Sequence, residues 1–161
     1  MPVNQTEYSA ASYSSSNSQQ LWSSLAKSDL ISLDDHEQQA SGVSGGHTIA
    51  RHVGKTISEL VARFPGVPIS SSFFDKELAE VAASEWFKKH YTNFNAWLMD
   101  PARDEIRYAQ ELTLSHILGI FIYGNDSNKI VYMSKKINLV IKVKPHNGKD
   151  FHILTSFPIP E

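Results

Sequence analysis

The amino-acid sequence changes its hydrophobic period part-way along the chain, and this change limits the fold class. In the first half, apolar residues recur at helical spacing, as Ile57, Leu60, Val61 and Phe64 do at positions i, i+3, i+4 and i+7. In the second half, β-branched and aromatic residues dominate, and apolar and polar residues alternate over residues 137–143. Helices followed by antiparallel strands predict an α+β domain, with N-terminal helices packed on a curved antiparallel β-sheet.

Helix boundaries are predicted from capping and helix-breaking residues. A short helix is expected over residues 47–53. A second helix begins after a capping box formed by Thr56 and Glu59 and ends before the sequence Pro-Gly-Val-Pro. A longer helix begins after Asp75 and ends near Asp100. Its inward face is predicted to consist of Leu78, Val81, Ala82 and Trp86.

Five strands are predicted in the second half of the chain. Between the last two, Asn147–Gly148 indicates a β-hairpin, because this pair favours a tight turn with positive φ angles. In the last strand, alternation predicts Ile153, Thr155 and Phe157 on one face and His152 on the other. The predicted strands lie within residues 106–115, 117–124, 129–134, 137–145 and 151–157.

The N-terminal quarter of the chain differs from the rest in composition. Residues 1–43 are rich in Ser, Gln and Asn, and such a segment buries too little apolar surface to offset the entropy lost on ordering. We therefore expect a largely disordered tail or linker, with a short helix within residues 21–35 in which Trp22 docks on the folded part. Residues 41–46 are expected to form a hinge, and the folded domain is predicted to span residues 44–161.

Charge follows the same division. Residues 1–40 hold one lysine and five acidic residues, a net charge of −4, whereas residues 41–161 hold fourteen basic and twelve acidic residues, a net charge of +2. A slightly basic domain can bind a polyanion at a local site. It lacks the cationic blocks of proteins that bind nucleic acid nonspecifically, so RNA or DNA would bind at a site and not along a broad surface.

Several classes of protein are excluded by composition. The chain contains no cysteine, which rules out disulfide bonds, thiolate metal ligands and cysteine nucleophiles. No apolar run approaches the roughly 20 residues that span a bilayer, and the N-terminus lacks a secretory-signal pattern, so no membrane anchor is expected. No cluster of Asp, Glu and His has the spacing of metal ligands, and we expect no metal site and no cofactor.

Residues 45–56, GGHTIARHVGKT, have features of both a nucleotide-binding loop and a catalytic histidine segment. A Walker-type loop needs the pattern G-x-x-x-x-G-K-[ST] after a buried parallel strand. The residues Gly54, Lys55 and Thr56 supply the end of this pattern, but Ile49 stands where the first glycine belongs. The strands that follow are also predicted to be antiparallel, and a nucleotide-binding loop is therefore rejected.

The two histidines of this segment are predicted to point in different directions. On a helix over residues 47–53, His52 lies about 60° from Ile49, at the margin of the apolar face, where a half-buried position at a cleft edge is expected. His47 points roughly the opposite way, beside Arg51, unless the helix begins one or two residues later.

Two more residues are placed for chemistry. Arg63 lies about 60° beyond Leu60, at the margin of the apolar face of its helix, where the alternative role is a surface ion pair with Glu59. Thr155 is a lone hydroxyl on the apolar face of the last strand, where the alternative is an ordinary β-branched strand residue.

Motifs at both ends of the domain resemble the bacterial RNase A-like toxin domain, which forms the C-terminal part of contact-dependent growth inhibition proteins and related polymorphic toxins. The motifs are GGHTIARHVGKT, SSF at 71–73, AWL at 96–98 and ILTSFP at 153–158, in order over residues 44–158. The resemblance implies an RNase A-like fold without disulfides and an RNase A-like toxin domain over residues 44–161.

The proposed active site of that family contains a histidine in the H-V-G-K segment, an arginine in the following helix, and a threonine and a tyrosine in the last strand. The resemblance thus implies catalytic roles for His52, Arg63 and Thr155. The tyrosine position is occupied by Phe157, which lacks the hydroxyl and is expected to bind substrate by stacking on a base. Lys55 is expected to contact a phosphate of the substrate.

The resemblance implies a metal-independent endoribonuclease that cleaves RNA by transphosphorylation through a 2′,3′-cyclic phosphate, and no DNA partner is expected. We expect His52 to act as the base, Arg63 to stabilise the transition state, and Thr155 to bond a phosphate oxygen or help recognise the base. The general acid is open: His47, grouped with the substrate-binding residues, is preferred, and His152 is the other candidate.

The resemblance also implies a biological role. The toxin is expected to be delivered from the producing bacterium, to act on RNA in the cytoplasm of the target cell, and to be neutralised in its producer by a cognate immunity protein. The alternative function is a non-catalytic RNA-binding or protein-interaction module on the same fold, motivated by Phe157 and by the unassigned second histidine. A metal-dependent nuclease is disfavoured because no ligand cluster is present.

Overall fold

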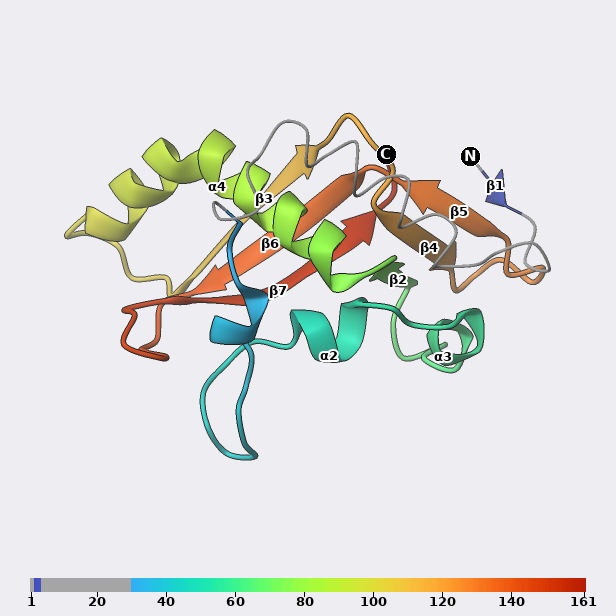
Figure 1. Ribbon diagram of the computed structural model, residues 1–161, viewed down its shortest axis with the longest axis horizontal. Helices are drawn as coiled ribbons and strands as arrows, with labels where there is room; N and C mark the ends of the chain where they lie inside the picture. Colours follow the sequence, from blue (N-terminus) through green and yellow to red (C-terminus); the bar gives the residue numbers. More distant parts are fainter. Residues whose placement is uncertain (1, 4–29) are drawn as a thin grey trace.

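The computed structural model describes residues 2–3 and 30–161 of the chain. These residues form an α+β fold with two antiparallel sheets and one long helix (Figure 1). The α+β class predicted from the sequence is confirmed. The helices are η2 (Leu33–Asp35, a 3₁₀ helix), α2 (Thr48–His52), α3 (Ile57–Val61) and α4 (Lys76–Met99), and the strands are β1 (Pro2–Val3), β2 (Ile69–Phe73), β3 (Arg107–Thr113), β4 (Gly119–Tyr123), β5 (Val131–Ser134), β6 (Lys136–Lys142) and β7 (His152–Ile159).

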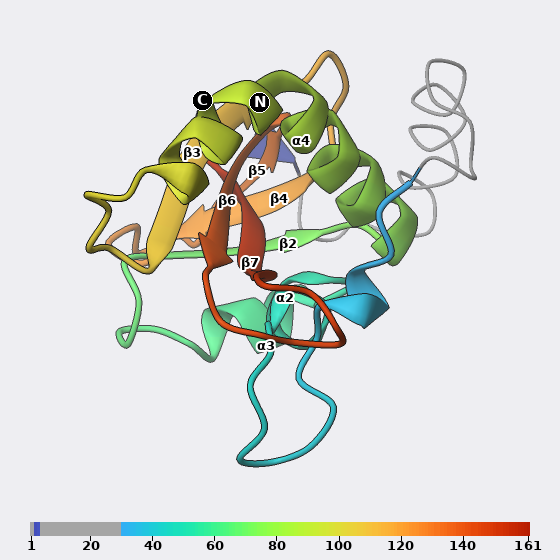
Figure 2. The same cartoon turned by 90° about the vertical axis from the view of Figure 1, so that its left-hand side faces the viewer.

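The strands form two sheets, whereas the sequence predicted one curved sheet. The strand orders are β1-β5-β4-β2 and β3-β6-β7, and every described pair is antiparallel. The chain passes between the sheets at Lys135, where the buried Ser134 hydroxyl donates to the carbonyl oxygen of Ile159 and accepts from the Lys136 amide. Figure 2 shows β2 and β4 running across the direction of β6 and β7, and β7 contacts both.

Helix α4 covers one face of the sheet β3-β6-β7. Its N-cap is Asp75, whose carboxylate accepts a hydrogen bond from the Leu78 amide at 2.8 Å, as predicted. The helix contacts all three strands of this sheet and lies across it in Figure 2. The core therefore forms between α4 and the sheet. The predicted inward residues Leu78, Val81, Ala82 and Trp86 are all fully buried.

Strand β2 was missed by the sequence analysis, because three consecutive serines do not form an apolar pattern. All three serines, 70–72, are buried where β2 pairs with β4. The Ser72 hydroxyl donates to the Phe73 carbonyl oxygen and accepts from the Lys55 amide. Small polar side chains that bond to the backbone can occupy a buried strand, so polarity alone did not exclude this one.

The packed body extends N-terminal of residue 44, the predicted start of the domain. Leu33 is fully buried, its amide donates to Glu80 Oε2 at 2.8 Å, and the Ile31 amide donates to Ser84 Oγ at 2.8 Å. A short helix was expected within residues 21–35. Residues 30–35 of this range are described, and the helical part of them is the 3₁₀ turn η2. The other predictions for the tail, including Trp22, fall outside the described residues, except that Pro2–Val3 forms β1 against β5.

A β-bulge in β7 changes the faces predicted for its side chains. Val140 pairs with Thr155, but Ile141 pairs with Ile153, so Leu154 is an extra residue in β7. Ile153 consequently faces the core with Ile141, on the side opposite Thr155. His152, paired with Lys142, falls on the face of Thr155. The predicted alternation from residue 151 to 157 was wrong because it assumed an unbroken ladder.

His36 joins the N-terminal segment to β7. Its side chain is 6% exposed, and its Nδ1 accepts a hydrogen bond from the Ile153 amide at 3.0 Å. Burial, together with the nearby charges of Lys149 and His152, lowers the pKa of His36 to about 4. The neutral imidazole is therefore the form that the fold requires, because a protonated Nδ1 has no lone pair for the amide.

This requirement predicts a loss of stability in mild acid. The folded pKa of His36 lies below the unfolded value of 6.5, so its contribution is fully present above about pH 6.5. It is lost as the pH falls toward 4, by about 3 kcal/mol at most. We expect His36→Gln, which keeps an acceptor for the Ile153 amide but does not titrate, to flatten the pH dependence of the free energy of unfolding.

The measurement is urea unfolding at several pH values between 7.5 and 5. His116→Gln, which removes a histidine from the loop between β3 and β4, is the matched control and should keep the slope of the parent protein. Equal slopes for the parent and His36→Gln would show that His36 does not link folding to pH.

Candidate active site

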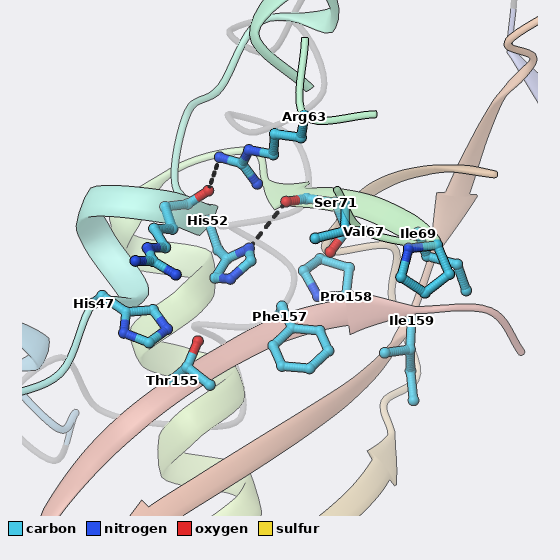
Figure 3. Close-up of a pocket in the computed structure, with 12 residues that line it drawn as sticks. His47, His52, Arg63, Val67, Ile69, Ser71, Thr155, Phe157, Pro158 and Ile159 are labelled. Carbon is cyan, nitrogen blue, oxygen red and sulfur yellow. Dashed lines mark hydrogen bonds between the residues drawn. The ribbon is translucent and has the colours of Figure 1, made fainter. Parts of the chain in front are cut away.

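A pocket of about 660 Å³ opens between α2, β7 and the segment that leads into β2 (Figure 3). This volume suits a small ligand or one nucleotide of a longer chain. One end is basic and the other apolar, and none of the lining residues is acidic. The basic end consists of His47, Arg51, His52 and Arg63, the apolar end of Val67, Pro68, Ile69, Pro158 and Ile159, and Ser71, Thr155 and Phe157 complete the lining.

His52 is the last residue of α2 and is half-buried, as predicted. Its Nδ1 lies 3.1 Å from the carbonyl oxygen of Ser71 on β2. A carbonyl oxygen only accepts, so the neutral ring carries its proton on Nδ1 and its lone pair on Nε2. Its ring centroid lies 5.2 Å from that of Phe157. The site therefore offers a base, Nε2, with a fixed tautomer beside an aromatic wall.

The protonation state of His52 follows from burial. Burial lowers its pKa to about 4, and the charges of Arg63, His47 and Arg51 act in the same direction. The hydrogen bond to Ser71 opposes this shift without reversing it. His52 is therefore neutral at pH 7, which is the state that a proton acceptor needs.

His47 lies in the pocket, although a helix over residues 47–53 predicted that it would point away. It is the N-cap of α2, with φ −141° and ψ 25°, so its side chain does not follow the helical direction. Its ring centroid lies 6.3 Å from that of His52. Burial lowers the pKa of His47, and Arg51 and Arg107 lower it further. The later helix start, which the sequence left open, is the one observed.

The backbone before α2 is fixed against the free edge of β7. The His47 amide donates to the Leu154 carbonyl oxygen at 2.9 Å, and the Gly46 amide donates to the His36 carbonyl oxygen at 2.7 Å. A Cβ on Gly46 would lie 2.1 Å from the carbonyl oxygen of Ile153, so only glycine allows this approach. Gly46, expected to end a hinge, is thus part of the site's support.

Arg63 points into the pocket from the turn after α3 (Figure 3). The helix was expected to continue to residue 64, but it ends at Val61, since Pro65 disfavours helical geometry at the residue before it. Arg63 is half-buried, and its Nη2 donates to the carbonyl oxygen of Arg51. This bond, and not the alternative ion pair with Glu59, orients the guanidinium toward His52.

Thr155 and Phe157 both point into the pocket from β7 (Figure 3). Thr155 is 8% exposed, and its hydroxyl has no hydrogen-bond partner among the described residues. Buried hydroxyls are usually bonded, so an unpaired one at a pocket wall is available to a ligand. Phe157 is half-buried and supplies a ring face beside His52.

Lys55 lies outside the pocket. Its ammonium group is 3.9 Å from Glu59 Oε2, one turn away on α3. Two residues not assigned by sequence reasoning take part instead: Ser71, which sets the tautomer of His52, and Arg51, which lines the pocket and accepts from Arg63. The SSF motif contains Ser71, but its contribution comes from a backbone carbonyl, to which no side-chain pattern points.

The described part of the chain contains no group of three or more His, Asp or Glu side chains arranged to hold a metal ion. Within the same residues, no helix is long and apolar enough to cross a membrane.

Comparison with known proteins places this site in a family. The model of the bacterial CdiA-CT RNase A domain matches residues 46–158, which include every residue of the pocket except Ile159. The chain belongs to the bacterial CdiA-CT RNase A family. The resemblance drawn from the sequence motifs is thereby confirmed, and the chain is a toxin nuclease domain of the contact-dependent growth inhibition type.

A solved structure agrees with this assignment. A chain in the crystal structure of a CdiA-CT/CdiI complex from Y. kristensenii 33638 superposes with a TM-score of 0.62 at 26% sequence identity. The alignment covers 71% of the present chain and all of that one. A comparison with curated protein sequences gave no match.

The environment of His52 in this CdiA-CT RNase A domain predicts its titration. NMR of the imidazole should show the Nδ1–H tautomer and a pKa of about 4. Arg63→Gln should raise that pKa, because the cation of Arg63 lowers it. The matched control Lys55→Gln removes a cation outside the pocket and should leave it unchanged. A pKa near 6.5 in the parent protein would contradict the inferred burial of the ring.

Proposed function

We propose that this CdiA-CT RNase A domain is a metal-independent endoribonuclease that cleaves RNA by transphosphorylation. The observation that supports this best is a pair of neutral histidines 6.3 Å apart in a pocket with two arginines and no acidic residue. RNA supplies its own nucleophile, the 2′-hydroxyl, so the protein needs to provide only a base, an acid and positive charge. The groups that line the pocket match these three requirements.

The first half of the reaction uses His52. Its Nε2 takes the proton of the 2′-hydroxyl, and the oxygen attacks the adjacent phosphorus. Positioned acid–base catalysis of this kind typically contributes about 10²–10⁴-fold. Because Ser71 holds the Nδ1 proton, the ring cannot present the wrong nitrogen to the substrate.

Arg63 and Thr155 stabilise the phosphorane-like transition state. The guanidinium is a permanent cation with several donors, and its bond to the Arg51 carbonyl oxygen leaves other N–H groups for phosphate oxygens. The unpaired hydroxyl of Thr155 donates to a non-bridging oxygen of the phosphate or to the base. Preorganised donors of this kind stabilise charge as it develops.

The second half of the reaction uses His47 as the acid. The bond between phosphorus and the 5′-oxygen breaks, and the 5′-oxygen takes a proton from His47, which leaves a 2′,3′-cyclic phosphate and a 5′-hydroxyl. Burial and two arginines favour the neutral form of His47 in the free protein. The negative charge of a bound phosphodiester opposes them and favours the protonated form.

Phe157 and the apolar end of the pocket bind the base. An aromatic face stacks on any base, which fits the phenylalanine that this chain has in place of the family's tyrosine. The apolar wall near Ile69 and Ile159 continues this surface. The hydroxyl of a tyrosine is not needed for the stacking role.

The biological setting follows from the family. We infer that a cognate immunity protein binds this domain, as CdiI binds CdiA-CT in the structure from Y. kristensenii 33638. We further infer that the domain is delivered from the producing bacterium and degrades RNA in the cytoplasm of the target cell.

Incubation of the purified chain with total RNA tests the reaction. We expect cleavage that persists in EDTA and gives 2′,3′-cyclic phosphate ends. His52→Ala should reduce the rate by about 10²–10⁴-fold, whereas Lys55→Ala, at the edge of the same segment but outside the pocket, should have a much smaller effect. Intact RNA that is still bound would support the non-catalytic module, and cleavage abolished by EDTA would indicate a metal-dependent nuclease.

A change of leaving group tests the role of His47. His47→Ala should slow cleavage of RNA by about 10²–10⁴-fold, but should slow a nucleoside 3′-(4-nitrophenyl phosphate) far less, because nitrophenolate leaves without a proton. His52→Ala removes the base and should slow both substrates alike. An equal loss on both substrates for His47→Ala would instead assign His47 to binding.

A further inference from the structure

The open face of the sheet β3-β6-β7 continues from the pocket wall. Residues directly opposite each other on neighbouring strands point to the same side, so the register defines rows across this face. Thr155 lies in a row with Val140 and Ala109. The neighbouring row contains His152, Lys142 and Arg107, and His152 is buried whereas Arg107 is exposed. Helix α4 covers the other face of the sheet (Figure 2).

Arg107 and Lys142 form a like-charge pair without compensation. They are directly opposite each other, an arrangement that destabilises a sheet. Neither takes part in any ion pair found in the described part of the chain. Two rows further along the same face from Val140, Lys136 is paired with Glu111 at 3.3 Å. One end of the face is therefore neutralised and the other end is left cationic.

The strip between the cationic pair and the pocket is open. Its side chains are short: Ala109 is exposed and Val140 is half-buried. With strands about 4.8 Å apart and a rise of about 3.3 Å per residue, the Cα atoms of Arg107 and Thr155 are separated by roughly 12 Å. A long arginine side chain shortens that gap. The register places Arg107 on the same face of the sheet as Thr155, and its charge lowers the pKa of His47 in the pocket.

We propose that Arg107 and Lys142 form a second phosphate-binding subsite, which holds a phosphate of the same RNA strand outside the bond that is cleaved. The strand leaves the pocket at Thr155, crosses the strip of Ala109 and Val140, and places a backbone phosphate between the two cations. The phosphate supplies the negative charge that the pair lacks. This inference rests on the proposed ribonuclease function, and it predicts a preference for long RNA over a dinucleotide.

The test compares substrates of two lengths. In the full chain, Arg107→Ala combined with Lys142→Ala should lower kcat/KM for a long mixed-sequence RNA at least fivefold more than for the best-cleaved dinucleoside monophosphate, mainly through KM. Any effect of Arg107 on His47 acts on both substrates and cancels in this ratio. The dependence of log(kcat/KM) on log[salt] should also flatten, by about 0.7 for each lost phosphate contact.

The matched control is Lys88→Ala combined with Lys89→Ala. It removes two exposed cations from α4, over the opposite face of the sheet, and should leave both the length ratio and the salt slope unchanged. An equal loss on the long and short substrates for the Arg107 and Lys142 variant would overturn the subsite. Unchanged RNA cleavage together with weakened binding of the immunity protein would also overturn it and would assign the pair to a protein interface.

RNA binding separates failure of the subsite from failure of the proposed reaction. In a His52→Ala background, fluorescence anisotropy of a labelled RNA should show weaker binding when Arg107 and Lys142 are both replaced by alanine. If the parent protein cleaves neither substrate, the ribonuclease proposal fails, yet this binding difference still tests the subsite. Equal RNA affinities of the His52→Ala protein with and without the Arg107 and Lys142 substitutions would refute the subsite.

Discussion

The attachment of the chain around Gly46 to the outer edge of β7 is the constraint on which the site depends. β7 pairs with β6 along one edge only, and its other edge binds the start of α2 through the bond from the His47 amide to Leu154 and the bond from the Ser156 amide to Thr48 Oγ1. The bulge at Leu154 lies at this attachment. One short contact thus sets the positions of both pocket histidines relative to Thr155 and Phe157.

The charges of its lining residues make the pocket suited to an anionic ligand. Burial keeps the histidines neutral, while Arg51 and Arg63 stay charged and no acidic side chain lines the cavity. Arg51 is exposed and Arg63 is half-buried, and neither meets an acidic side chain in the pocket, so the site attracts an anion from solvent. Arg107 and Lys142, the like-charge pair on the neighbouring row of the sheet, extend the positive charge beyond the pocket. Both features suit a substrate with several phosphates.

Local sequence rules predicted much of this fold, and they failed where distant segments meet. The Asp75 cap, the Thr56 capping box and the residues of α4 in the core follow from spacing alone, and the structure confirms them. The bulge at Leu154 has no local sequence signature, because it is a shift in the pairing of β7 with another strand, β6. Strand β2 was missed because its three serines form no apolar pattern, and the distant backbone partner of Ser72, the Lys55 amide, has no local signature either.

In the proposed reaction, the substrate sets the protonation states of the two pocket histidines, because the hydrogen-bond partner of His52 is the Ser71 carbonyl oxygen and not a carboxylate. A carboxylate bonded to the imidazole would stabilise the imidazolium as well as the tautomer. The Ser71 carbonyl oxygen fixes the tautomer but has no full charge, so burial and the nearby cations determine the pKa and keep the ring neutral. The phosphodiester then provides the missing negative charge. In the proposed reaction, His52 accepts a proton in the neutral form that the free protein already favours, whereas His47 donates a proton after the bound phosphodiester has raised its pKa.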